Sequence, residues 1–499
     1  MPDAASKHPD GPVPGLRQRA GLWVGLALFV LVLAAPAPAG LEPKAQRMAA
    51  IALLMAVWWI SEAIPIAATS LLPMALGPVL GVAPSAKIAL AYGNHIIFLF
   101  LGGFVLALGM ERCGLHRRLA LGVIDAIGSG PARLILGFMV ATAFLSMWVS
   151  NTATTLVMLP IATAVIRQLA TPERERELFE TFGSVLLLGV AFSASVGGVG
   201  TIIGTTTTVA FLGFLQERFP DRAPISFLDW ARVGMPIAAV FIPVMWAYLC
   251  RFGGPLPVSR IRFDSAADVI AGERRKLGAM AQDEKALTAV CVATALAWML
   301  RPWWAAWFPD PKAIHDTTVA VAMAVLLFML PERWTPRPAG RLMDWETVQR
   351  GVPWGILLLM GGGFAMAAGI EDSGLAAYVG SRMGALRGTP VWVLMPAACL
   401  IGVAMTEVTS NVATVLMLAP VLVETALGLG IDPYLLLIPT TIMSSFAFML
   451  PVATPPNAVV FASGWIRIEQ MFRVGIVLDL LALAIVPLMV WAIGAGQFK

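Results

Sequence analysis

The sequence LSMWVSNTATT, residues 145–155, returns 260 positions later as MTEVTSNVATV, residues 405–415. Both stretches lie within long apolar segments, and both place a Ser-Asn pair, at 150–151 and 410–411, where the hydrophobic pattern is interrupted. Serine and asparagine side chains compete for backbone hydrogen bonds, so they favour helix ends over helix interiors. We therefore expect two related breaks in buried helices, one in each half of the chain.

The same offset aligns the two halves well beyond these stretches. LFLGGFVLALGMERCGL at 99–115 matches LMGGGFAMAAGIEDSGL at 359–375 in its glycine pair, its acidic residue and its final Gly-Leu. Further along, Pro160 pairs with Pro420 in the same register. A register that holds without a gap over this distance indicates an internal duplication.

Composition defines the class of protein. Hydrophobic residues make up 58% of the 499 residues and charged residues only 13%, about half of the roughly 25% usual in soluble proteins. Mean hydropathy is +0.81. We predict an all-α polytopic membrane protein, because a helix crosses the hydrocarbon core with about 20 apolar residues. Apolar runs near that length include 21–39, 46–60, 133–149, 152–166, 231–249, 286–300, 316–330, 391–405, 412–427 and 470–493.

The net charge of +4 is interpreted as membrane topology. Lys7, Arg17 and Arg19 precede the first apolar run, and more basic residues lie in a polar segment at 251–285, which predicts that both segments are cytoplasmic. These charges are dispersed, so nucleic-acid binding is not expected. We expect the first run to be a retained helix, with a cleaved signal peptide as the alternative. The four cysteines show no metal-type spacing.

The glycine-rich segments 99–115 and 359–375 have two interpretations. Each is a full-length span, or each is a re-entrant hairpin in which paired glycines permit the bend and the close packing. Irregular backbone at membrane depth is tolerated only where protein or a water-filled cavity surrounds it. Both interpretations stay open at this point, as does the choice between inverted and parallel repeats.

The breaks themselves offer chemistry that a solute can use. Carbonyls that end one half-helix suit a small cation, and amides that begin the next suit an anion. Asparagine supplies both kinds of group from one side chain. Polar segments at 195–208 and 444–457 follow the two breaks, and Pro455-Pro456 cannot lie inside a regular helix. Duplicated breaks of this kind are typical of substrate sites in carriers; the alternative is that Ser and Asn only join helices together.

SFAFMLPVATPPNAV at 445–459, TEVTSNVAT at 406–414, LSMWVSNTATT and LFLGGF at 99–104 carry a family resemblance. The chain resembles the divalent anion:sodium symporter (DASS) family, including the INDY-type carriers of dicarboxylates, citrate or sulfate. The resemblance implies two inverted repeats with re-entrant hairpins and broken helices, a scaffold domain, and a transport domain that moves as a rigid body. It also implies a homodimer in the bacterial inner membrane, with sodium ions co-transported and no organic cofactor.

We expect six segments along the chain. They are a cytoplasmic tail at 1–20, scaffold helices at 21–92, a first repeat at 93–250, the polar loop at 251–285, further scaffold helices at 286–350 and a second repeat at 351–499.

Position by position, the resemblance implies two sodium sites beside one substrate site. The first sodium site would use Ser146, Ser150, Asn151 and Gly204. The second would use Thr406, Thr409, Asn411 and Ala453. Substrate carboxylates would meet Asn151, Thr152, Thr205, Asn411, Val412, Thr454 and Pro455. Two departures from the family pattern concern these sites: Thr206–Thr208 replaces a Pro-Pro-Asn sequence, and Val412 lacks a hydroxyl.

The expected function is sodium-coupled symport of C4-dicarboxylates such as succinate, malate or fumarate, by an elevator-like mechanism. Alternatives are exchange of such acids, or citrate or sulfate as the substrate. An enzyme is not expected, since no Ser–Lys or Ser–His dyad recurs with the repeats. No Lys or Arg lies next to either tripeptide, Ser150-Asn151-Thr152 or Ser410-Asn411-Val412, in the sequence. Bound sodium would therefore supply the charge that a buried dianion needs. Glu407 is predicted to act directly or to face a structural partner.

Overall fold

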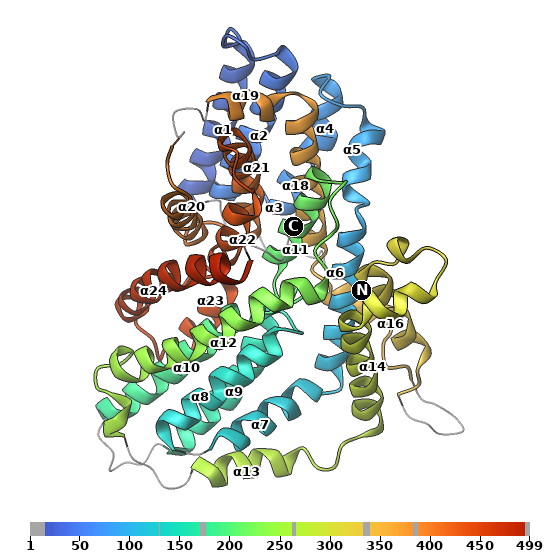
Figure 1. The fold of residues 1–499 in the computed structure, drawn as a ribbon. Helices are drawn as coiled ribbons and strands as arrows, with labels where there is room; N and C mark the ends of the chain where they lie inside the picture. Colours follow the sequence, from blue (N-terminus) through green and yellow to red (C-terminus); the bar gives the residue numbers. More distant parts are fainter. Residues whose placement is uncertain are drawn as a thin grey trace, which may run out of the picture.

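The computed structural model describes residues 15–128, 130–169, 176–261, 266–332, 340–382 and 388–494 (Figure 1). Throughout these ranges regular structure is helical, apart from one isolated bridge between Pro331 and Arg341. Among the described residues, seven helices are long and apolar enough to cross a membrane, or eight if a pair bent by 69° counts as one span. Five shorter apolar helices accompany them. The predicted all-α polytopic class is confirmed.

The helices before the first repeat are α1 (Leu16–Ala34), α2 (Pro43–Ser61), α3 (Ile66–Thr69), α4 (Leu72–Val79) and α5 (Ser85–Tyr92). The first half continues with α6 (His95–Arg112), α7 (Leu115–Ile127), α8 (Pro131–Ser146), α9 (Asn151–Leu169), α10 (Arg176–Gly198), α11 (Thr206–Arg218) and α12 (Phe227–Phe252). The connecting part has α13 (Ala266–Lys276), α14 (Gln282–Met299), α15 (Arg301–Trp304), α16 (Asp316–Met329) and α17 (Trp345–Gly351), with short 3-10 turns between them.

The second half repeats the order of the first. It comprises α18 (Trp354–Asp372), α19 (Leu375–Arg382), α20 (Val391–Thr406), α21 (Asn411–Leu429), α22 (Tyr434–Met443), α23 (Pro455–Phe461) and α24 (Ile468–Gly494). Helices α6 to α12 therefore correspond one by one to α18 to α24. The outer limits of the predicted segments stay a prediction, and residues 1–14 of the expected tail lie outside the described residues.

The glycine-rich segments lie inside continuous helices. Helices α6 and α18 run through them without a break, and each ends just before a glycine in the left-handed region, Gly114 (φ 76°) and Gly374 (φ 79°). Of the two interpretations, the structure therefore shows the full-length helix. The glycine pairs serve close packing, since a Cβ at Gly102 would lie 2.7 Å from the backbone of Ala320.

The hairpins lie one helix pair further along. Helices α8 and α9 pair through the turn at 147–150, and α20 and α21 pair through the turn at 407–410. The tripeptides Ser150-Asn151-Thr152 and Ser410-Asn411-Val412 thus lie at the tips of two helical hairpins. Helices α8 and α20 have 16 residues each, so they are about 24 Å long, shorter than a hydrocarbon core of about 30 Å. That length fits a re-entrant arm better than a complete crossing.

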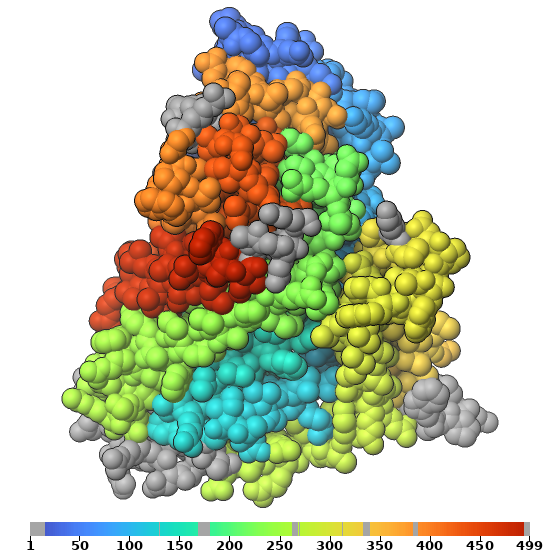
Figure 2. All heavy atoms as spheres, viewed as in Figure 1, coloured from blue at the N-terminus to red at the C-terminus, as the bar shows by residue number. Residues whose placement is uncertain are grey.

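The two halves exchange their short helices. Helix α11 of the first half packs against α21 and α22 of the second, while α23 of the second half packs against α9 and α10 of the first (Figure 1). Rings reinforce the junction: Phe192 and Phe448 have centroids 5.0 Å apart, and Phe241 and Phe446 are stacked at 5.2 Å. In Figure 2 the red atoms of the chain's last helices lie directly against the green atoms of the first half.

Close helix contact inside each half depends on glycine. A Cβ at Gly197 of α10 would lie 2.3 Å from the carbonyl oxygen of Ala143 on α8. Corresponding glycines of α12 and α24 behave alike, because a Cβ at Gly234 would lie 2.2 Å from Val199 O and one at Gly475 would lie 2.3 Å from Phe448 O. These contacts press α12 and α24 against the loops at which α10 and α22 end.

We predict that Gly197→Ala lowers the free energy of unfolding of the detergent-purified protein by about 1–3 kcal/mol, because the added methyl group overpacks the α8–α10 contact. The melting temperature should fall accordingly. The matched control is Gly122→Ala on α7, where a Cβ meets nothing within 4 Å. That substitution should leave stability unchanged or raise it slightly. Equal melting temperatures for the two variants would contradict the packing described here.

Candidate functional site

The first hairpin tip gathers oxygen atoms. Ser146 ends α8 and Asn151 begins α9, and the Oγ of Ser146 lies 2.6 Å from Oδ1 of Asn151 and 2.7 Å from the carbonyl oxygen of Ala194 on α10. A hydroxyl has one hydrogen to donate. It can therefore satisfy only one of these two oxygens, and the other is left for another donor or for a cation.

In this orientation the carboxamide oxygen of Asn151 faces only acceptors and its nitrogen faces only donors. Turned over, its nitrogen would lie 3.1 Å from Ala194 O, 3.1 Å from Gly204 O and 2.6 Å from Ser146 Oγ. The same spot is thus completed either by an amide donor or by a cation that the Asn151 oxygen and its neighbours would bind. Carbonyl, amide and hydroxyl oxygens are the ligands of hard cations, so the donor set fits sodium.

Two glycines make room for this arrangement. A Cβ at Gly198 would lie 2.4 Å from Asn151 Oδ1, and one at Gly204 would lie 2.4 Å from Gly198 O and 2.7 Å from Ser146 O. A side chain at Gly204 would displace backbone, and one at Gly198 would displace the Asn151 carboxamide. The structure therefore brings together three residues predicted for the first sodium site: Ser146, Asn151 and Gly204.

The second hairpin tip repeats the first with a different hydroxyl. Thr406 ends α20, and its Oγ1 lies 2.7 Å from Oδ1 of Asn411 and 2.6 Å from the carbonyl oxygen of Ser444. Thr406, Asn411 and Ser444 thus correspond to Ser146, Asn151 and Ala194. Both clusters consist of a hydroxyl, a carboxamide and a backbone carbonyl at the end of the next helix.

The helices that follow the polar loops begin in the same way. Thr205 and Thr454 are N-caps with nearly identical backbones (φ −137°, ψ 138° and φ −138°, ψ 149°), and each hydroxyl accepts a bond from an amide in the first turn, that of Thr207 or of Asn457. The departure at 206–208 therefore does not move the start of α11.

The departure changes how the loop is held. The Nδ2 of Asn457 donates to Ala447 O at 2.9 Å and to Leu450 O at 3.0 Å, which fastens the second loop onto α23. At the corresponding position, the buried Thr208 Oγ1 has no hydrogen-bond partner among the described residues. The first loop is instead held by Thr201, whose hydroxyl accepts from Gly204 N at 3.1 Å, and by Trp230, whose Nε1 donates to Val199 O at 2.8 Å.

The remaining predicted residues lie close by in sequence but less close in contact. Ser150 caps α9, since its Oγ accepts a bond from Ala153 N at 3.3 Å. The hydroxyl of Thr409 turns to α2, where it donates to Trp59 O at 3.4 Å; the structure does not bring it to Thr406. Thr152 is half-buried, Pro455 is exposed, and Val412, Ala453 and Thr454 are buried.

Glu407 proves to have a structural partner. This residue is 3% exposed, and its carboxylate accepts hydrogen bonds from the amides of Met449 at 2.9 Å and Leu450 at 3.1 Å. It thereby ties the second hairpin tip to the loop at 444–454. The first tip has Met147 at this position and no carboxylate; there the hydroxyl of Thr201 ties the loop to the tip by donating to Met147 O at 2.5 Å. Asp479 of α24, 5% exposed, lies beside Glu407.

No basic residue adjoins the second tripeptide in the sequence, but a distant arginine contacts its tip in the structure. Nη2 of Arg17, on α1, donates to the carbonyl oxygen of Val408 at 2.6 Å and also contacts the carbonyl of Ile60. Arg17 lies 391 positions away in the sequence, so only the packing of α1 and α2 against the hairpin reveals the contact.

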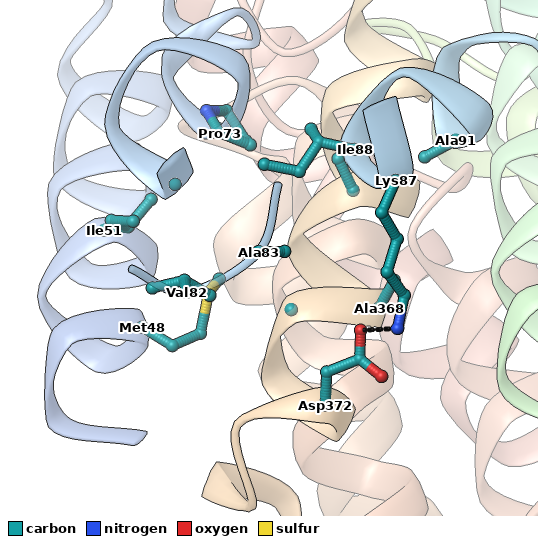
Figure 3. Close-up of a pocket in the computed structure, with 13 residues that line it drawn as sticks. Met48, Ile51, Pro73, Val82, Ala83, Lys87, Ile88, Ala91, Ala368 and Asp372 are labelled. Atoms are coloured by element: carbon teal, nitrogen blue, oxygen red, sulfur yellow. Dashed lines mark ion pairs between the residues drawn. The ribbon is translucent and has the colours of Figure 1, made fainter. Parts of the chain in front are cut away.

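A separate small cavity lies away from both tips (Figure 3). It is bounded by α2, α4, α5 and α18, has a volume of about 20 Å³, and is lined mostly by apolar side chains such as Met48, Ile51 and Ile88. Lys87 and Asp372 form an ion pair of 2.7 Å at its edge. A cavity of this size holds about one water molecule, so it is a packing gap between helices and not the site of a dianion.

An all-helical membrane chain with duplicated, oxygen-lined helix breaks defines a secondary transporter. The family model described as the sodium:sulfate symporter transmembrane region matches residues 17–495. The chain belongs to this family, which confirms the resemblance noted in the sequence. It is a transport protein and not an enzyme, and a multi-pass protein of the bacterial inner membrane.

Curated relatives match along nearly the whole chain. The chain is 38% identical over 477 residues to the sodium-dependent dicarboxylate transporter SdcS of Staphylococcus saprophyticus, covering 95% of this chain and 91% of that protein. Over 479 residues it is also 38% identical to the SdcS protein of Staphylococcus aureus, with the same coverage.

Two solved transporters share the fold. The YdaH transporter of Alcanivorax borkumensis superposes with a TM-score of 0.56 at 14% identity, over 97% of this chain and 100% of that one. MtrF of Neisseria gonorrhoeae, described among antimetabolite efflux pumps, gives a TM-score of 0.57 at 14% identity, over 94% of each chain. At this identity the likeness shows the fold alone.

We predict that Glu407→Gln lowers the free energy of unfolding by about 1–3 kcal/mol, because a neutral amide oxygen replaces a charged acceptor for two buried amides. Melting of the purified protein, followed by tryptophan fluorescence, measures the change. Glu469→Gln, in the exposed first turn of α24, removes the same charge where no such tie exists and should be neutral. A neutral Glu407→Gln would refute the structural role.

Proposed function

We propose that this chain is a sodium-coupled symporter of C4-dicarboxylates such as succinate, malate and fumarate. The observation that carries the proposal is the pair of matching oxygen clusters at the two hairpin tips. The names of the Staphylococcus relatives, at 38% identity, support both the coupling ion and the substrate class.

Two sodium ions are proposed to bind at the tips. The first would be held by Ser146, Ser150, Asn151 and Gly204. The second would be held by Thr406, Thr409, Asn411 and Ala453. Support differs between them. In the first set Ser146, Asn151 and the carbonyl of Gly204 already converge, whereas in the second Thr409 must release Trp59 before its hydroxyl can contribute. Ions act here as cargo, and each also stabilises the turn that holds it.

The substrate is proposed to lie between the tips. Its carboxylates would meet the first turns of four helices, α9, α11, α21 and α23, through Asn151, Thr152, Thr205, Asn411, Val412, Thr454 and Pro455. Amides at helix N-termini suit anions. A dianion that leaves water still requires compensating positive charge, and two sodium ions supply it. Cation binding should therefore promote substrate binding, and by linkage the reverse.

The exchange of α11 and α23 between the halves supports movement as one body. Because each short helix packs against the hairpin of the other half, neither tip can shift alone. We propose that α8 to α12 and α20 to α24 form a transport domain that moves against the remaining helices in an elevator-like manner. We also propose inverted symmetry and a homodimer, in line with the family resemblance.

Uptake of radiolabelled succinate into proteoliposomes tests the function. We expect uptake that requires an inward sodium gradient and proceeds into empty vesicles. Uptake that requires preloaded dicarboxylate and ignores sodium would replace the symporter by an exchanger. Competition by malate, fumarate, citrate and sulfate defines the substrate class; inhibition by sulfate or citrate, with none by fumarate or malate, would contradict the C4-dicarboxylate assignment.

Asn151→Ala and Asn411→Ala should each reduce sodium-driven succinate uptake to background, because each removes the carboxamide at the centre of one oxygen cluster. The matched control is Asn94→Ala, which removes a carboxamide that caps α6 and bonds Glu217 on α11, outside both oxygen clusters, and should retain uptake. Equal amounts of the three variants in the membrane are checked by detergent size-exclusion chromatography. Wild-type uptake by both tip variants would remove the proposed sites.

A further inference from the structure

The second hairpin tip is attached to the N-terminal helix pair. Arg17 of α1 donates from Nη2 to Val408 O at 2.6 Å, and the same nitrogen contacts the carbonyl of Ile60 near the end of α2. Beside it, the Thr409 hydroxyl reaches Trp59 O at 3.4 Å. One guanidinium therefore joins α1, α2 and the turn at 407–410.

The position of Arg17 is unusual for a helix. It lies in the first turn of α1, where the positive end of the helix dipole disfavours a cation. Its partners lie at the opposite kind of position, since Ile60 and Val408 are at or just beyond the C-terminal ends of α2 and α20, where carbonyls are unpaired and cations are favoured. Basic residues near a first span also follow from topology, but topology applies equally to Arg19, which makes no such contact among the described residues.

The first hairpin tip is held by different chemistry. The hydroxyl of Thr201, in the loop of the same half, donates to Met147 O at 2.5 Å. The ring of Trp148 stacks on Phe227 with centroids 6.1 Å apart, and Phe227 stacks on Trp298 at 4.9 Å. In the second tip Val408 replaces Trp148, and its side chain is 50% exposed. The second tip thus relies on a guanidinium where the first relies on a ring stack.

We propose that Arg17 is a positioning residue for the second cation site. By holding the carbonyl of Val408 it fixes the turn that connects Thr406 to Asn411, and so presents their oxygens in the arrangement that binds sodium. Without it, the Val408 carbonyl loses a charged donor, and the turn must be ordered by the ion itself. Sodium then binds more weakly at the second tip, while the first tip is unaffected. The inference rests on the proposed function, because it concerns one of the proposed sodium sites.

The test is sodium-dependent thermal stabilisation of the full-length purified protein. Sodium raises the melting temperature of a protein that binds it only when folded, and the sodium concentration that gives half of this rise reports affinity. We expect Arg17→Gln to raise that concentration about tenfold, as for the loss of a hydrogen bond from a charged donor. Arg17→Lys should give an intermediate value, because an ammonium group keeps the charge but cannot bridge two carbonyls as a guanidinium does.

Arg19→Gln is the matched control, since it removes the same charge from the same helix two residues away. If Arg17→Gln and Arg19→Gln reach half of the rise in melting temperature at the same sodium concentration, and the wild type responds normally, the inference is overturned. The symporter proposal is then left intact. No sodium response in the wild type overturns the proposed function instead. If Arg17→Gln does not yield folded protein, Arg17→Lys is the deciding variant. A sodium concentration for half of the rise about threefold above that of the wild type supports the positioning role, and a concentration equal to that of the wild type overturns it.

Discussion

The constraint on which this structure depends is that a broken helix inside a membrane exposes backbone groups that water cannot satisfy. Each half of the chain contains two such breaks, the hairpin tip and the loop after the next helix. Most of the exposed groups find protein partners: the Glu407 carboxylate takes the amides of Met449 and Leu450, and Asn457 takes two loop carbonyls. Around Asn151 and Asn411, hydroxyl, carboxamide and carbonyl oxygens converge instead, and on this convergence rests the proposal that the tips bind cations.

Much of this was predictable from the sequence. The duplication, the helical class and the breaks at the two tripeptides follow from composition and register, because Ser and Asn side chains favour helix ends over helix interiors. The location of the hairpins was not predictable, since a glycine pair permits both a bend and close packing, and here Gly102 serves packing. Arg17 was missed because no local pattern relates α1 to a turn 391 residues away. The pairing of Ser146 with Asn151 is local, and the family resemblance implied it by assigning both residues to one sodium site.

The two halves share a backbone arrangement but hold it through different contacts. The second loop is fastened by Asn457 and tied to its tip by Glu407, whereas the first has Thr208 and Met147 at these positions. The first tip is supported by the ring of Trp148 and the second by a charged contact from Arg17. A duplicated scaffold has thus kept the oxygen clusters and varied their supports. Two sites with the same geometry and different supporting contacts need not bind sodium with equal affinity.

The exchange of short helices also bears on how the protein is made. Helices α9 and α10 leave the ribosome long before α23, the element that packs against them. Until residues 455–461 have been synthesised, the faces of α9 and α10 that contact α23 stay uncovered in the bilayer. Neither half is therefore complete as a separate folding unit. The junction between the halves therefore depends on contacts distant in sequence, which form slowly. A nascent chain cut short before α23 would present that bare face to membrane quality control.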